Sequence, residues 1–94
     1  MKVFVVQAEN REQYEDYSDW IEGVFYSKEL AENYINEEQA RYERDDKRIN
    51  ELDELYCQDQ LTEEEIKELI SLKYYWRKAW RCCPRYWIEE YKMN

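Results

Sequence analysis

The sequence predicts a small α+β protein in which a three-stranded sheet, made of two N-terminal strands and one C-terminal strand, packs against a long antiparallel helical hairpin in the order ββααβ. Three observations lead to this prediction. Short runs of β-branched and aromatic residues near both ends of the chain are typical of strands. The stretch between them repeats its apolar residues at helical spacing. Glycine and proline, which interrupt regular elements, occur once each.

The first two strands are expected at residues 2–8 and 20–26. Both runs are rich in valine, isoleucine and aromatic residues, which pack well on a pleated surface. Gly23 lies inside the second run and indicates a β-bulge or a close approach of another group to the backbone. Residues 9–19 are polar and have no clear period, so we expect them to form a long hairpin loop.

A long exposed helix is expected to begin after Ser27. Serine is a good N-cap, and Glu29 places negative charge in the first turn, where the helix dipole favours it. Apolar residues then recur at intervals of seven, and Glu38 and Asp45 interrupt the resulting seam. Most other residues are charged, so the apolar stripe is narrow, and about thirty residues give a helix of roughly 45 Å. The seam includes Ala31, Ile35, Tyr42, Ile49, Leu52 and Tyr56.

A second helix is expected at about residues 62–81. Its first residues, 62–65, have the sequence of a capping box, and apolar residues follow at helical spacing. Because the preceding turn is short, the two helices should be antiparallel. The alternative is a strand over residues 73–82, where aromatic residues alternate with others. Pro84 ends the helical region, and residues 85–93 have the composition of a third strand.

Acidic residues dominate the composition, with 23 Asp and Glu against 14 Lys and Arg and a formal net charge of −9. We expect one domain, 1–94, because a chain of this length has little surplus for a second. Histidine is absent, which excludes an imidazole base and Ser-His or Cys-His catalytic pairs. A single glycine excludes glycine-rich phosphate loops. We therefore expect no enzyme activity, no catalytic residue and no cofactor.

The three cysteines, Cys57, Cys82 and Cys83, are expected to be structural thiols. Their number is odd and no C-x-x-C spacing is present, so we expect neither a disulfide framework nor a metal site. This usage favours the reducing cytoplasm. No apolar run approaches the ~20 residues that a bilayer requires, so a membrane is not an expected partner.

Residues 9–22 form the strongest candidate for a partner-binding surface. Six carboxylates are interleaved with three aromatic side chains, so the segment combines dense negative charge with residues that anchor protein interfaces. Duplex DNA carries one charge per ~1.7 Å of axis, and a groove that binds it can be occupied by such an array. The alternatives are a solvated loop and a calcium site, although the spacing is not that of an EF-hand. The candidate residues are Glu9, Glu12, Tyr14, Glu15, Asp16, Tyr17, Asp19, Trp20 and Glu22.

Two other charged regions have simpler interpretations. The first helix mixes acids and bases at intervals of three and four, which is typical of a solvated surface. Residues 71–94 hold six basic and two acidic residues interleaved with aromatic ones. Core packing explains this pattern, and the alternative is a nucleotide pocket that uses Arg77, Arg81 or Arg85. The interleaved residues are Tyr74, Tyr75, Trp76, Arg77, Lys78, Trp80, Arg81, Arg85, Tyr86 and Trp87.

Three segments carry a resemblance, and the first is the strand-like V-F-V-V of residues 3–6. In residues 20–35, W-I-E-G-V-F-Y-S-K-E-L-A-E-N-Y-I, a strand ending in G-V-F precedes a capped helix that begins E-x-A-x-x-Y, and residues 85–91, R-Y-W-I-E-E-Y, close the chain with I-E-E. This pattern resembles a group of small uncharacterised proteins carried mainly by bacteriophages and mobile elements of Gram-positive bacteria. The resemblance implies a fold and an origin, and it implies no catalytic residue. The matching residues are Gly23, Val24, Phe25, Ser27, Glu29, Ala31, Tyr34, Ile88, Glu89 and Glu90.

We therefore expect a non-enzymatic inhibitor of phage type that works in the bacterial cytoplasm. Its partner would be a host protein with a basic groove, such as a nuclease or a defence complex, as for an anti-CRISPR or anti-restriction protein. The acidic surface would mimic DNA, and the net charge opposes direct binding to nucleic acid. The alternatives are a protein that sequesters a nucleotide signal through its C-terminal region, and a structural or accessory phage protein, a homo-oligomer whose long helices pair with copies of themselves.

Overall fold

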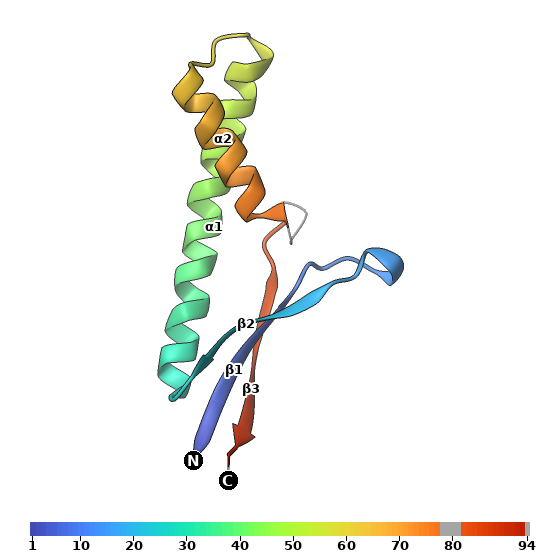
Figure 1. The fold of residues 1–94 in the computed structure, drawn as a ribbon, viewed down its shortest axis with the longest axis vertical. Helices are drawn as coiled ribbons and strands as arrows, with labels where there is room; N and C mark the ends of the chain where they lie inside the picture. Colours follow the sequence, from blue (N-terminus) through green and yellow to red (C-terminus); the bar gives the residue numbers. More distant parts are fainter. Residues whose placement is uncertain (78–81, 94) are drawn as a thin grey trace.

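The computed structural model describes residues 1–77 and 82–93 and confirms the predicted α+β fold with its ββααβ order (Figure 1). A short 3₁₀ helix, η1, interrupts the loop between the first two strands. The molecule is elongated, with principal extents of 57 × 30 × 16 Å. The elements are β1 (Lys2–Glu9), η1 (Tyr14–Asp16), β2 (Asp19–Phe25), α1 (Lys28–Cys57), α2 (Glu63–Tyr75) and β3 (Arg85–Lys92).

The sheet has the order β2-β1-β3, and both pairs of neighbouring strands are antiparallel. The most apolar strand, β1, occupies the centre, where Val6 and Ala8 are fully buried. The register of β1 with β2 shifts after Val6, which lies opposite Gly23, so the predicted irregularity at this glycine is confirmed. The ring of Phe25 also approaches Gly23, to within 3.1 Å of the position that a Cβ atom would occupy.

One face of the sheet packs against the N-terminal half of α1 (Figure 1). The predicted cap is present, since the backbone N–H of Leu30 donates to Ser27 Oγ at 3.2 Å. Ala31 is fully buried, and the rings of Phe25 and Tyr34 lie 5.4 Å apart between sheet and helix. The early part of α1 therefore fixes the position of the sheet.

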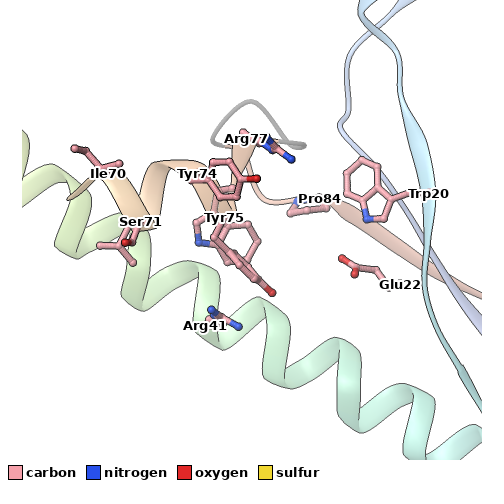
Figure 2. Close-up of a pocket in the computed structure, with 11 residues that line it drawn as sticks. Trp20, Glu22, Arg41, Ile70, Ser71, Tyr74, Tyr75, Arg77 and Pro84 are labelled. Carbon is pink, nitrogen blue, oxygen red and sulfur yellow. The ribbon is translucent and has the colours of Figure 1, made fainter. Parts of the chain in front are cut away.

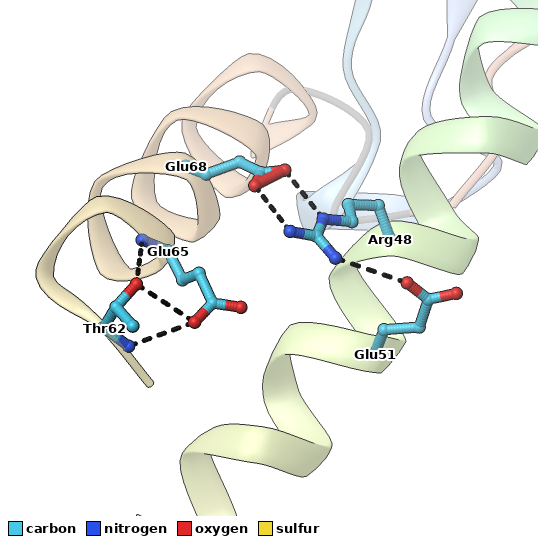
Figure 3. Close-up of polar contacts among 5 residues, drawn as sticks. All are labelled: Arg48, Glu51, Thr62, Glu65 and Glu68. Atoms are coloured by element: carbon cyan, nitrogen blue, oxygen red, sulfur yellow. Dashed lines mark hydrogen bonds and ion pairs between the residues drawn. The ribbon is translucent and has the colours of Figure 1, made fainter. Parts of the chain in front are cut away.

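The C-terminal half of α1 packs against α2 around a small apolar core. Ile49 and Leu52 from α1 meet Leu69 from α2 and Trp76 at its end. An ion pair reinforces this contact, because Arg48 donates from Nε and Nη2 to the carboxylate of Glu68 at 2.7 and 2.9 Å (Figure 3). The packing of the two helices is thus established, and their antiparallel direction stays a prediction.

The acids that interrupt the heptad seam have a structural role. Glu38 is buried and accepts a hydrogen bond of 2.9 Å from the hydroxyl of Tyr75. Asp45 accepts a bond of the same length from the indole N–H of Trp76. Two seam positions of α1 therefore accept hydrogen bonds from the aromatic end of α2, and the bond to Asp45 satisfies the N–H donor of the buried Trp76.

The second helix begins as predicted, with both hydrogen bonds of the capping box between Thr62 and Glu65 (Figure 3). It ends at Tyr75 rather than near 81, and residues 78–81 lie outside the described part of the chain. Over residues 73–75 the chain is helical, so the strand alternative is wrong there.

Candidate functional site

The loop of residues 10–18 joins β1 to β2 and projects from the body of the molecule (Figure 1). Its order depends on Asn10, whose side chain is fully buried. The amide Nδ2 donates to the carbonyl of Asp16 at 2.7 Å, and Oδ1 accepts from the backbone N–H groups of Glu12 and Ser18, both at 3.2 Å. One side chain thus replaces the strand pairing that ends at this point and closes the loop on itself.

A second contact ties the loop to the distant segment before β3. Arg11 has a left-handed backbone, with a φ of 61°, and its Nε donates to the carbonyl of Cys83 at 2.8 Å. Glu9, at the base of the loop, pairs with Arg85 at 3.3 Å. The base of the loop is therefore held by the first residue of β3 and by the segment that precedes this strand.

The loop presents carboxylates and tyrosine to solvent. Glu15, Asp16 and Asp19 are exposed, and Glu12 is half-buried. In the described residues, 1–77 and 82–93, these four acids form no ion pair. The side chain of Tyr14, at the tip, is 91% exposed.

Tyr17 lies beside these acids and donates from its hydroxyl to Asp19 Oδ2 at 3.3 Å. Loss of solvation and the neighbouring Glu9 and Asp19 carboxylates raise the pKa of Tyr17. The hydroxyl therefore remains a protonated donor, and the loop offers an aromatic ring next to negative charge.

The structure divides the nine predicted partner-binding residues into three groups. Glu9 is half-buried and belongs to the base of the loop through its pair with Arg85. Trp20 and Glu22 lie on β2, and both line a pocket instead of the loop surface. The remaining six form the surface that we call the acidic loop: Glu12, Tyr14, Glu15, Asp16, Tyr17 and Asp19.

The pocket has a volume of about 650 Å³ and lies between β2 and the C-terminal end of α2 (Figure 2). We call it the β2–α2 pocket. It brings together residues from two segments that the sequence treated as separate candidates, and α1 adds Arg41, which sequence reasoning did not single out. Its lining residues are Trp20, Glu22, Arg41, Ile70, Ser71, Leu72, Tyr74, Tyr75, Trp76, Arg77 and Pro84.

Not all of the predicted basic and aromatic residues reach this pocket. Arg85, Tyr86 and Trp87 lie on β3 and are not part of its lining. Lys78, Trp80 and Arg81 fall outside the described residues. The signal that was missed is Glu38: an acid within an apolar seam marks the place where α1 meets the aromatic end of α2.

A polar network lies beside the pocket. Tyr34 donates from its hydroxyl to Glu22 Oε2 at 3.3 Å, and the guanidinium of Arg41 lies 3.8 Å from the centre of the Tyr75 ring. Burial, and then the Glu38 carboxylate, raises the pKa of Tyr75 to about 12. Burial, followed by the charge of Glu22, also raises the pKa values of Tyr34 and Tyr86. The hydroxyls of Tyr34 and Tyr75 therefore stay protonated and donate to Glu22 and Glu38, respectively.

One hydroxyl of this group is unsatisfied. The Tyr86 oxygen is buried and has no hydrogen-bond partner among the described residues. Such atoms are rare in folded proteins, since burial of an unpaired polar group costs free energy. Within residues 1–77 and 82–93, no three His, Cys, Asp or Glu side chains are grouped so that they could hold a metal ion.

Comparison with known proteins assigns a family. The sequence model of a domain of unknown function, DUF7336, matches residues 1–78. The chain belongs to the DUF7336 family. The DUF7336 match includes β1, β2, α1 and α2, and with them the acidic loop and all of the β2–α2 pocket except Pro84. No curated protein and no solved structure matches the chain.

The helices were also compared with the requirements of a lipid bilayer. Neither α1 nor α2, the helices of the described residues, combines the length and the apolar character needed to cross one. Their surfaces are rich in charge instead, and several of these charges pair within a helix, as Lys28 does with Glu32 at 3.9 Å.

Proposed function

We propose that this protein is a binding protein rather than an enzyme, and that it docks its acidic loop into a basic groove of a bacterial protein. The observation that supports this proposal most directly is the construction of the loop. A buried asparagine orders a projecting segment whose carboxylates have no basic partner among the described residues and whose tip carries the exposed Tyr14.

The physical argument has two parts. An ordered loop loses less conformational entropy on binding than a flexible one, so more of its contact energy appears as affinity. Carboxylates that form no ion pair within the described residues can pair with cations of another molecule, which speeds encounter and restricts the choice of partner. Tyr14 and Tyr17 supply the aromatic anchors that dominate many interfaces.

The favoured target is a groove that normally holds nucleic acid. Such a groove is lined by Arg and Lys, and a compact array of carboxylates competes with phosphates for the same side chains. A nuclease or defence complex in the bacterial cytoplasm, inhibited in the manner of an anti-CRISPR or anti-restriction protein by a phage-encoded chain, has this chemistry. Under this proposal the protein does not itself contact nucleic acid.

The experiment is capture of partners from bacterial lysate on the immobilised chain, with a matched control. The test variant carries Glu12→Gln, Glu15→Gln, Asp16→Asn and Asp19→Asn. The control variant carries four exposed acids changed on the helices and their turn: Glu37→Gln, Glu43→Gln, Glu54→Gln and Asp59→Asn. Both variants lose the same number of charges, so a general effect of net charge would affect both equally.

We expect the unaltered chain and the control variant to retain a nucleic-acid-binding protein from the lysate, and the test variant to fail to retain it. Added duplex DNA should displace this protein from the immobilised chain. Retention should also weaken as salt rises, because the contact is between charges. Equal retention by the test variant and the control would refute the acidic loop as the binding surface.

Self-association is a second candidate because α2 exposes an apolar stripe. Ile66, Ile70 and Tyr74 follow one another at intervals of four, and the exposed fractions of their side chains are 42%, 63% and 62%. Residues four apart share one face of a helix, and a second copy can cover such a face. Sedimentation at several protein concentrations tests this: a rising mass that Ile70→Lys abolishes supports a helix-mediated dimer, and a constant monomer mass refutes it.

A further inference from the structure

We propose that the β2–α2 pocket binds a guanine nucleotide, with the base between aromatic walls, its N–H edge at Glu22 and its phosphate at Arg77. This site is separate from the acidic loop and goes beyond the function proposed above. Its volume of about 650 Å³ lies within the range of small-molecule pockets, which is about 300–1,000 Å³.

The walls suit a flat, apolar ring. Trp20 stands on β2 across the pocket from Tyr74 and Tyr75 on α2, and Pro84 lies between them (Figure 2). Aromatic faces stack with bases of any kind, so these walls supply affinity for a planar ring and do not choose among bases. Selection of one base over another must therefore come from the polar side chains of the pocket.

Arg77 is the group available for an anion. Its guanidinium lies 4.1 Å from the centre of the Tyr74 ring, and it forms no ion pair with any side chain of residues 1–77 or 82–93. Arg41 differs, because Glu38 and Asp45 lie 4.0 and 3.6 Å from it. An unpaired guanidinium held over a ring is a good partner for phosphate.

Glu22 is the group that selects the base. A carboxylate only accepts hydrogen bonds, and one oxygen of Glu22 already accepts from Tyr34. The carboxylate keeps further acceptor capacity, which N–H donors of a ligand can use. The pairing edge of guanine carries a ring N–H and an amino group side by side, whereas adenine carries an amino group beside a ring acceptor that a carboxylate repels.

The overall charge limits the number of phosphates. A net charge of −9 repels anions at long range, and each added phosphate increases this repulsion. Arg77, the pocket arginine that forms no ion pair within residues 1–77 and 82–93, matches a single phosphate group. We therefore infer that guanosine monophosphate is preferred over the triphosphate.

The test is calorimetric titration of the whole chain with guanosine monophosphate, adenosine monophosphate, guanosine and inorganic phosphate. We expect guanosine monophosphate to bind at least about tenfold more tightly than guanosine or adenosine monophosphate, since each lost charge-assisted hydrogen bond costs about that factor. Inorganic phosphate alone should not bind measurably. No binding of guanosine monophosphate, or equal binding of the two monophosphates, overturns the proposal.

Variants separate the two polar roles. Arg77→Gln should lower the affinity for guanosine monophosphate to that for guanosine and leave guanosine itself unchanged, while Glu22→Gln should remove the preference for guanine. Arg44→Gln is the control, because this exposed α1 residue is outside the pocket and loses the same charge. An equal loss with Arg44→Gln overturns the assignment of Arg77. The acidic-loop variant should bind the nucleotide normally, so this proposal and the proposed function fail independently.

Discussion

Replacing Asn10 with alanine should cost about 2–3 kcal/mol of folding free energy. The change removes three hydrogen bonds, one of 2.7 Å and two of 3.2 Å. Each is worth about 0.5–1.5 kcal/mol net, and the groups of Glu12 and Ser18 that lose their acceptor lie near enough to the surface to recover some hydration. For a chain of this size, 1 kcal/mol corresponds to a shift in Tm of about 4–8 °C.

Guanidinium denaturation followed by tryptophan fluorescence and circular dichroism measures this cost. Asn10→Asp should also be destabilising, because it keeps the acceptor for both N–H groups but places a buried carboxylate oxygen against the carbonyl of Asp16. Asn36→Ala, an exposed helical change, is the control and should stay within about 0.5 kcal/mol of the unaltered chain. If Asn10→Ala also stays within that limit, the loop does not depend on Asn10 and the reasoning is refuted.

Three further predictions concern the body of the molecule. Leu52→Ala should lower the free energy of unfolding by about 3 kcal/mol because the side chain is fully buried between the helices, and a loss under 1 kcal/mol in denaturation would contradict this. Arg48 holds the pKa of Glu68 below its ordinary 4.5, so the stability from this pair is present above pH 4.5 and is lost as the pH falls through the lowered pKa. Arg48→Gln should therefore be less stable than the unaltered chain at pH 7. Thermal melts should show this difference in Tm shrinking below pH 4.5. Tyr86→Phe should leave Tm unchanged or raise it, because the Tyr86 hydroxyl has no hydrogen-bond partner among residues 1–77 and 82–93. Tyr75→Phe should lower Tm, because the buried Glu38 loses a donor, and the reverse order in parallel melts would contradict this description of the network.

The elements could be predicted because their signals are local. Ser27, the capping box at Thr62 and the bulge beside Gly23 each depend on residues within a few positions of one another. The seam was predicted less well: Ile49 and Leu52 are buried, while Tyr56 is 67% exposed at the end of α1. A heptad pattern does not show where the partner helix stops.

The role of Glu38 and Asp45 could not be derived from spacing alone. Each accepts a hydrogen bond from a residue more than thirty positions away, Tyr75 and Trp76 respectively. The sequence shows an acid in an apolar seam, which looks like an interruption. The acid forms a polar contact only when the aromatic donors at the end of the second helix lie opposite it. That placement depends on tertiary structure, which residue spacing does not show.

The candidate surface was predicted in part. Residues 9–22 are contiguous in sequence, but β2 begins at Asp19, and from there alternate side chains point to opposite faces of the sheet. Trp20 and Glu22 therefore line the pocket, and the acidic loop keeps the residues before them. Asn10, which organises the loop, has no sequence signal beyond its position at the end of an apolar strand.

Hydrogen exchange on the chain, with and without the partner recovered by capture, tests the central claim most directly. The account predicts that binding slows exchange of the backbone amides in residues 10–18 more than anywhere else. Slowed exchange confined to α2, with the loop amides unchanged, would contradict it.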